Sequence, residues 1–363
     1  MSHEIYLDWN ATAPLRPEAA AAIAEALALG GNPSSVHRRG RAARRLVENS
    51  RAAVAALVGA PTDAVIFTSG GTEANHLALL GSGRERVLVS AVEHSSVLQA
   101  VPDAERIPVD DNGIVDLAAL AALLDAGPPP ALVSVILANN ETGVIQPVRA
   151  VAEIVHAHGA LFHCDAVQAA GKMKLSMAEI GADLMTLSAH KIGGPSGIGA
   201  LISSAEVMPL LRGGGQERNQ RAGTENLSGI VGFAAAAAVC SPREYDRVRE
   251  LRDRLEAALP DAAVIGSDVA RLPNTSAIAM PGIPAETQII AFDLDGVMVG
   301  AGAACSSGKV GPSHVLAAMG VAPELANSTI RVSLGWSTSE ADIAHLIDAW
   351  TVLYRRTRGR KAA

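Results

Sequence analysis

Residues 159–203 read GALFHCDAVQAAGKMKLSMAEIGADLMTLSAHKIGGPSGIGALIS, and this stretch decides the fold. It holds three short apolar runs, 159–165, 182–189 and 198–203, separated by segments rich in alanine, serine and glycine. Apolar runs of about four to eight residues bounded by turn residues are typical of strands buried on both faces. The stretch therefore predicts strands of a mainly parallel sheet covered by helices on both sides.

The same alternation extends outward, from about Val65 to Ile202. Further apolar runs at 64–67, 86–92 and 131–138 alternate with amphipathic segments. Strands that alternate with helical segments indicate βαβ units, so we expect an α/β fold.

Arginines mark a predicted helix at 40–58, which precedes this core. Arg41, Arg44, Arg45 and Arg51 have the spacing of a single solvent-exposed face. We therefore expect a surface helix that presents all four side chains to water.

The pattern changes in the last third of the chain. From Ala263 onward, β-like pieces such as 274–280 and 330–334 are mixed with helical segments. This mixture indicates a smaller α+β domain. Its boundary is expected near residue 250, inside a connecting helix predicted over 243–259.

Composition excludes several classes of protein. The chain has 363 residues, enough for two domains, and its net charge of −7 without a basic face argues against nucleic acid as a partner. Cys164, Cys240 and Cys305 lie far apart and form no CxxC pair, which excludes a disulfide framework and the usual zinc signature. The longest uncharged apolar stretch, 231–240, is far shorter than the ~18 residues of a membrane span. We expect an untargeted cytoplasmic protein with no resident metal.

Polar residues after the predicted strands are candidates for a ligand site, because parallel α/β sheets bind ligands at the carboxyl ends of their strands. Gly71 and Thr72, in TSGGTEANH, stand between a strand and a helix, where exposed N–H groups suit a phosphate. His94 follows another strand, and Asn139 and Asn140 follow a third. A structural role remains the alternative for each: a capped helix, a hydrogen-bonding histidine and an Asx turn.

An aspartate closes one of the apolar runs. Asp165 ends LFHCD, and Gln168 follows by one helical turn. A carboxylate so close to a core needs a cationic partner, and no Lys or Arg is adjacent in the sequence, so a protonated ring nitrogen of a cofactor would serve. Cys164 points to the opposite face by strand alternation and is predicted to be a buried packing residue.

A lysine follows the next strand, in DLMTLSAHKIGGPSGIG. Ser188, His190 and Lys191 precede a glycine-rich loop there. A lysine at the end of a buried strand is costly unless its charge is used or removed, and a Schiff base does both. A Schiff-base lysine, an aspartate for a pyridine nitrogen and a phosphate loop at a helix start are the parts of a pyridoxal phosphate site.

The whole chain, from YLDWNATAP near the start to IRVSLGWST near the end, resembles the cysteine desulfurases of the NifS/IscS type. These enzymes belong to the class V aminotransferase group of pyridoxal phosphate enzymes. The most specific stretches are NPSSVHRRG, FTSGGTEANH, EHSSV, NNETGVIQP, HCDAVQAAGK, SAHKIGGPSGIG, GGGQERNQRAGTEN and GAGAACSSG.

The resemblance implies the pyridoxal phosphate fold type I in a homodimer. The large cofactor-binding domain, residues 13–250, would contain a mainly parallel seven-stranded sheet. Residues 1–12 and 251–363 would form the smaller α+β domain, which carries the catalytic cysteine loop.

The resemblance also implies the roles of the site residues. Lys191 would form the Schiff base, Asp165 would pair with the pyridinium nitrogen, and His94 would stack on the ring as a catalytic imidazole. The other cofactor contacts implied are Gln168 at the ring oxygen, Gly71, Thr72, Ser188 and His190 at the phosphate, Asn140 beside the cofactor, and Thr224 at the phosphate of the other subunit's cofactor.

For the substrate, L-cysteine, the resemblance implies a carboxylate grip by Arg331 with help from Asn140. Cys305, in a run of small residues with Lys309 nearby, would take the sulfur as a persulfide and L-alanine would leave. An acceptor protein would then receive the sulfur for iron–sulfur cluster assembly or tRNA thiolation. Any contact with an iron–sulfur cluster would be transient and made through this persulfide.

Three alternatives remain open. A selenocysteine lyase or an aminotransferase on the same scaffold would not need Cys305. A regulatory partner protein that binds the cofactor without catalysis is expected to lack Lys191 or Cys305, and both are present. A nucleotide-binding oxidoreductase is disfavoured because no GxGxxG follows the first strand.

Overall fold

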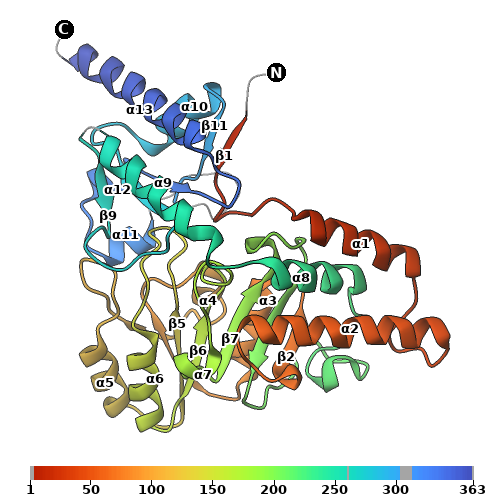
Figure 1. Cartoon of the computed structure of the whole chain (residues 1–363). Coiled ribbons are helices and arrows are strands. Elements are labelled where there is room, and N and C mark those ends of the chain that lie inside the picture. Colours follow the sequence, from red (N-terminus) through yellow and green to blue (C-terminus); the bar gives the residue numbers. More distant parts are fainter. Residues whose placement is uncertain (1–3, 260, 303–312, 362–363) are drawn as a thin grey trace.

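The computed structural model describes residues 4–259, 261–302 and 313–361, which form a large α/β unit and a smaller unit above it (Figure 1). A seven-stranded sheet lies at the centre of the larger unit, and β8 runs antiparallel to both of its neighbours while the other pairs are parallel. The predicted mainly parallel seven-stranded sheet is confirmed. In order across the sheet, the strands are β2 (Val65–Thr68), β8 (Gly199–Ser203), β7 (Leu184–Ser188), β6 (Leu161–Asp165), β5 (Ala131–Ile136), β3 (Arg86–Ser90) and β4 (Glu105–Ile107).

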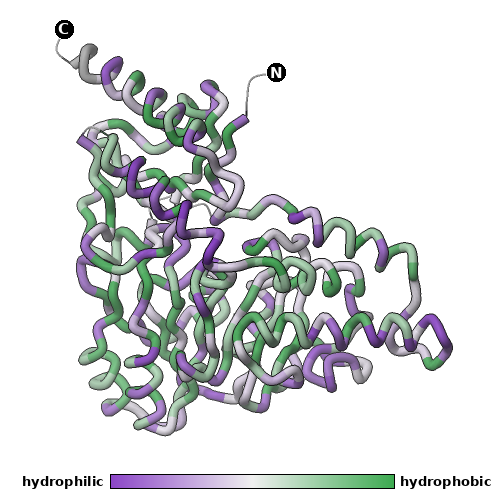
Figure 2. The backbone as a smooth tube through the Cα atoms, viewed as in Figure 1, coloured by the Kyte–Doolittle hydropathy of each residue, from purple (hydrophilic) through white to green (hydrophobic). Residues whose placement is uncertain are grey.

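Helices cover both faces of this sheet, as expected for strands that are apolar on both sides. Alternate side chains of each strand enter two separate hydrophobic clusters, so that Leu184 lies in one and Met185 in the other. Figure 2 shows mostly hydrophobic residues along these strands. One face is covered by α1 (Pro17–Leu29), α2 (Arg38–Leu57), α5 (Leu117–Ala126), α6 (Val148–Ala157), α7 (Met177–Ile180) and α8 (Leu227–Val239), and the other by α3 (Gly71–Gly81) and α4 (Ser95–Leu98).

The smaller unit joins the two ends of the chain. Strand β1 (Ile5–Leu7) pairs in parallel with β11 (Val297–Val299), and Ile5 and Leu7 belong to a hydrophobic cluster otherwise formed by residues 245–354. After Ile5 and Leu7, the next residue along the chain that belongs to this cluster is Tyr245. The remaining elements are the antiparallel strands β9 (Ala263–Ile265), β10 (Thr275–Ala279) and β12 (Thr329–Ser333), and the helices α9 (Glu244–Ala258), α10 (Ala285–Leu294), α11 (His314–Ala318), α12 (Pro323–Ala326) and α13 (Glu340–Lys361).

The prediction of four solvent-exposed arginines on α2 is wrong for Arg51. Its side chain is 1% exposed and forms a bidentate ion pair with Glu217 at 2.6 and 2.9 Å, whereas the other three arginines are exposed. Arg51 shares its helix face with the buried Val47 and Val54, four residues before it and three after it. The helical period therefore turns this arginine inward, where Glu217 and, at 3.2 Å, Glu48 of the same helix make its burial tolerable.

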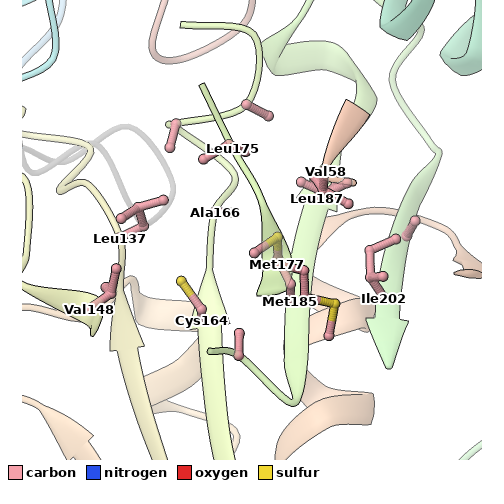
Figure 3. Close-up of a cluster of buried hydrophobic side chains, with 14 of the residues drawn as sticks. Val58, Leu137, Val148, Cys164, Ala166, Leu175, Met177, Met185, Leu187 and Ile202 are labelled. Carbon is pink, nitrogen blue, oxygen red and sulfur yellow. The ribbon is translucent and has the colours of Figure 1, made fainter. Parts of the chain in front are cut away.

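Cys164 is a packing residue, as predicted. Its side chain is fully buried in the cluster between the sheet and its helices, and Figure 3 shows its sulfur among side chains such as Leu137, Val148 and Leu175. Burial raises the pKa of the thiol well above its ordinary value, and the negative charges of Asp165 and Glu93 contribute less. The thiol therefore stays protonated and unreactive at neutral pH.

No helix in the described ranges is long and apolar enough to span a membrane.

Candidate active site

A cavity of about 320 Å³ lies at the carboxyl edge of the central sheet. Its walls come from the ends of β6 and β7, from the segments after β2, β3 and β5, and from β12 of the smaller unit. The structure thus brings together residues that are far apart in the sequence. The predicted site residues that line the cavity are Gly71, Thr72, His94, Asn140, Asp165, Gln168, Ser188, His190, Lys191 and Arg331.

Asp165 forms the buried anionic end of the cavity. It is the last residue of β6 and is 3% exposed. One carboxylate oxygen accepts from Asn75 Nδ2 at 2.8 Å and the other from the backbone N–H of Val167 at 3.0 Å. Both donors are neutral groups, and a carboxylate in this position suits a protonated ring nitrogen.

Lys191 lies across the cavity in the short 3-10 turn η2 (Ala189–Lys191) that follows β7. Its Nζ donates to the backbone carbonyls of Asn10 at 2.5 Å and Ala11 at 2.7 Å. The amine is therefore held by the N-terminal segment, which crosses from the smaller unit over the cavity. One cavity thus contains both a lysine amine and a buried carboxylate, as a Schiff-base cofactor requires.

The start of α3 provides a site for an anion. Its N-cap, Gly70, has no side-chain capping bond, and Gly71 and Thr72 of the first turn line the cavity. Exposed N–H groups at the start of a helix attract a phosphate, and Ser188 and His190 line the same cavity. A Cβ at Gly71 would lie 3.2 Å from a methyl group of Val167, so glycine relieves a close contact at this wall.

His94 is both a structural and a cavity residue. As the N-cap of α4, it accepts from the backbone N–H of Ser96 through Nδ1 at 3.1 Å, and it also lines the cavity. Burial is the main cause of its lowered pKa, and the neighbouring Asp165 opposes the shift. The ring is therefore neutral at pH 7, and because Nδ1 accepts, its proton lies on Nε2.

Burial also lowers the pKa of His190 to about 4, with Lys191 and Lys172 contributing as nearby positive charges. At neutral pH this imidazole therefore offers hydrogen bonds rather than a charge to an anion.

Arg331 forms the opposite wall, in the middle of β12. Its side chain donates to Asp8 Oδ1 at 2.7 Å and to the backbone carbonyl of Asn140 at 3.1 Å. Within the described part of the chain, Nε is buried without a hydrogen-bond partner. A guanidinium in the wall of a cavity suits a carboxylate ligand, which its terminal nitrogens can bind.

Thr224 lines a different pocket, with Glu217, Arg221 and Gly197. Its expected contact is with another subunit's cofactor, so that role stays a prediction. Cys305, with Lys309, lies outside the described residues.

Sequence reasoning missed three polar residues that complete the site. Asn10, Asn75 and Ser96 line the cavity. Asn75 Nδ2 bonds to Ser96 Oγ at 2.9 Å as well as to Asp165, and so links the carboxylate to the segment that holds His94. The signal for Asn75 was its position one helical turn after Gly71, and Ser96 stands two residues after His94. Asn139, by contrast, forms the alternative Asx turn by accepting from the backbone of residues 141 and 142.

The fold and the cavity define an enzyme of the pyridoxal phosphate fold type I class. The residues present fit this cofactor, because one cavity combines an uncapped helix start, a buried carboxylate and a lysine amine. The model of the aminotransferase class-V family matches residues 5–346. The chain belongs to this family.

Known relatives cover almost the entire chain. A cysteine desulfurase of Cereibacter sphaeroides is 44% identical over 95% of this chain and 94% of its own length. The cysteine desulfurase IscS of Dictyoglomus turgidum is 38% identical over 99% of this chain and 96% of its own. The crystal structure of a NifS-like protein from Rickettsia africae superposes with a TM-score of 0.90 at 37% identity, covering 97% of this chain and all of that one. The predicted resemblance, fold type and dependence on pyridoxal phosphate are confirmed.

Proposed function

We propose that this enzyme is a cysteine desulfurase that transfers the sulfur of L-cysteine to Cys305 and releases L-alanine. One observation carries the proposal: a single cavity is lined by Lys191, by Asp165 and by Arg331, the candidate for binding the substrate carboxylate. The relatives named cysteine desulfurase, which match along almost the full chain, support it.

Pyridoxal phosphate would be held at three points of this cavity. The start of α3, with Ser188 and His190, would bind the phosphate, Asp165 would accept from the ring nitrogen, and Gln168 would donate to the ring oxygen. His94 would cover the ring face. When bound, the cofactor supplies an electron sink for negative charge at the substrate's α-carbon.

Substrate binding and proton transfer fall to Arg331 and Lys191. The guanidinium, held by Asp8 and Asn140, would orient the carboxylate of L-cysteine with its remaining donors. Lys191 would move the α-proton. Its amine lies in the cavity wall, where it donates to the backbone carbonyls of residues 10 and 11.

The sulfur transfer balances without an external oxidant. The Cys305 thiolate attacks the substrate sulfur, an S–S bond forms, and the bond between sulfur and the β-carbon breaks. The electron pair of that bond stays on carbon, which takes a proton and leaves as L-alanine. The sulfur is oxidised and the carbon reduced by the same amount, so the products are Cys305 persulfide and alanine.

We propose a homodimer in which Thr224 of each subunit reaches the cofactor phosphate of the other. We also propose a large domain of residues 13–250 and a smaller domain of residues 1–12 and 251–363, which the pairing of β1 with β11 supports. An acceptor protein would take the persulfide sulfur for iron–sulfur cluster assembly or tRNA thiolation.

The function is tested by supplying the purified, cofactor-loaded protein with L-cysteine and a thiol reductant. We expect alanine and sulfide in equal amounts, and with L-cysteine alone we expect one persulfide per subunit. A selenocysteine lyase would release alanine from L-selenocysteine but leave L-cysteine intact. That outcome, or pyruvate in place of alanine, would contradict the proposal.

Gly300 offers a test of the Arg331 assignment. A Cβ there would lie 2.6 Å from Asp8 Oδ1 and 2.9 Å from Arg331 Nη2, so Gly300→Ala must displace this ion pair. We expect KM for L-cysteine to rise about tenfold while kcat changes less, since one charged hydrogen bond is disturbed. Steady-state kinetics measure both constants. An unchanged KM in Gly300→Ala would argue against substrate binding by Arg331.

A further inference from the structure

A second lysine lies behind the cavity wall. Lys172 is 3% exposed and is not among the cavity-lining residues. Its Nζ donates to Gln168 Oε1 at 2.8 Å and to Asn10 Oδ1 at 3.2 Å. A buried lysine is costly and is retained only where its hydrogen bonds are needed, yet the reaction proposed above gives Lys172 no role.

The two amides that Lys172 contacts have fixed orientations. The side-chain nitrogen of Gln168 lies 3.0 Å from the backbone carbonyl of Asn10, and a carbonyl only accepts. The side-chain nitrogen of Asn10 likewise lies 3.2 Å from the backbone carbonyl of Asn140. Both amide oxygens must therefore face Lys172, which donates to each of them. The Asn10 oxygen also accepts from Asn274 Nδ2 at 3.0 Å, whereas Lys172 is the donor to Gln168 Oε1.

We propose that Lys172 is a positioning residue that fixes the Gln168 amide with its N–H₂ group toward the cofactor. One N–H of that group bonds to the carbonyl of Asn10, and the second remains for the ring oxygen of pyridoxal phosphate. Without Lys172, the buried Gln168 Oε1 loses its donor, which loosens the amide and weakens the hydrogen bond from its N–H₂ group to the ring oxygen. The inference rests on the proposed function because it assumes that Gln168 meets the bound cofactor.

A purely electrostatic role is the competing explanation. Burial is the main cause of the lowered pKa of Lys172, and the positive charges of Lys191 and Arg331 add to it. Lys172 could therefore affect Lys191 directly, without Gln168. The two explanations differ in whether the effect of Lys172 depends on the Gln168 amide.

A double-mutant cycle separates them. Lys172→Met keeps most of the side-chain volume and removes the donor. We expect it to weaken pyridoxal phosphate binding to the cofactor-free full-length protein about tenfold and to shift the absorption maximum of the bound cofactor. In a Gln168→Leu background, the same substitution should change the dissociation constant by less than about twofold, because the group it positions is gone. Lys174→Met, at a side chain that is 82% exposed, is the matched control and should change neither quantity.

Equal weakening in both backgrounds would overturn the proposal in favour of direct electrostatics, and unchanged binding in Lys172→Met would also overturn it. If Lys172→Met does not fold, Lys172→Gln replaces it. Its shorter amide reaches fewer acceptors, and we expect a smaller weakening that again disappears with Gln168→Leu. A failure of the proposed function is seen separately, as a wild-type protein that binds the cofactor but forms no alanine from L-cysteine.

Discussion

Lys191→Ala is expected to remove the visible absorption band of the bound cofactor and to lower the desulfuration rate by about 10²- to 10⁴-fold or more. The substitution deletes both the amine that would bind the cofactor covalently and the base that would move the α-proton. No other lysine lines the cavity in the described part of the chain, so no neighbouring amine replaces it. Absorption spectra of the purified variant and single-turnover alanine release measure the two effects.

The control for this variant is Lys174→Ala, which removes an exposed lysine that does not line the cavity. It should retain the wild-type band and rate. Retention of the normal band by Lys191→Ala would contradict the cofactor assignment, whereas loss of the band with a normal rate would contradict the role of Lys191 in proton transfer.

Cys305→Ser is expected to keep the cofactor colour and to lose persulfide formation by about 10²-fold or more. A serine hydroxyl is a far weaker nucleophile toward sulfur than a thiolate. The other two cysteines are unsuited to replace it. Burial raises the pKa of Cys164 well above its ordinary value and that of Cys240 to about 11, so both remain thiols at neutral pH.

Cys240→Ser is the matched control, because Cys240 is half-buried at the end of α8 and lies away from the cavity. It should transfer sulfur at the wild-type rate. Persulfide formation is followed by alkylation of the protein after a single turnover with L-cysteine. A Cys305→Ser protein that still desulfurates at the wild-type rate would exclude Cys305 as the sulfur carrier.

Local sequence patterns were sufficient for six strands of the central sheet and for the polar residues that follow several of them. They did not predict the edge strand β4, whose three residues include Glu105 and Arg106. Asp165 and Lys191 could be placed because each one ends or follows an apolar run, and parallel strands bring such positions to one edge. The arrangement of β8 could not be predicted, since an apolar run of buried residues does not reveal its direction.

Contacts between distant segments explain what the sequence did not predict. Asn10 bonds to residues that are more than a hundred positions away, and nothing in the N-terminal segment marks it. Arg51 shares a helical face with Val47 and Val54, but its main ion-pair partner, Glu217, is 166 positions away and could not be placed opposite it from the sequence. Lys172 had a weak local signal, because it stands four residues after Gln168 in an otherwise small and apolar stretch.

The central claim, that sulfur passes from L-cysteine to Cys305, is tested most directly by locating the transferred atom. The cofactor-loaded protein is given one equivalent of L-cysteine labelled with a heavy sulfur isotope, alkylated and digested, and its peptides are analysed by mass spectrometry. We predict the label as a persulfide on the peptide that contains Cys305, with an equal amount of L-alanine in solution. Alanine release with the label on Cys164 or Cys240, or on no cysteine of the chain, would contradict the mechanism.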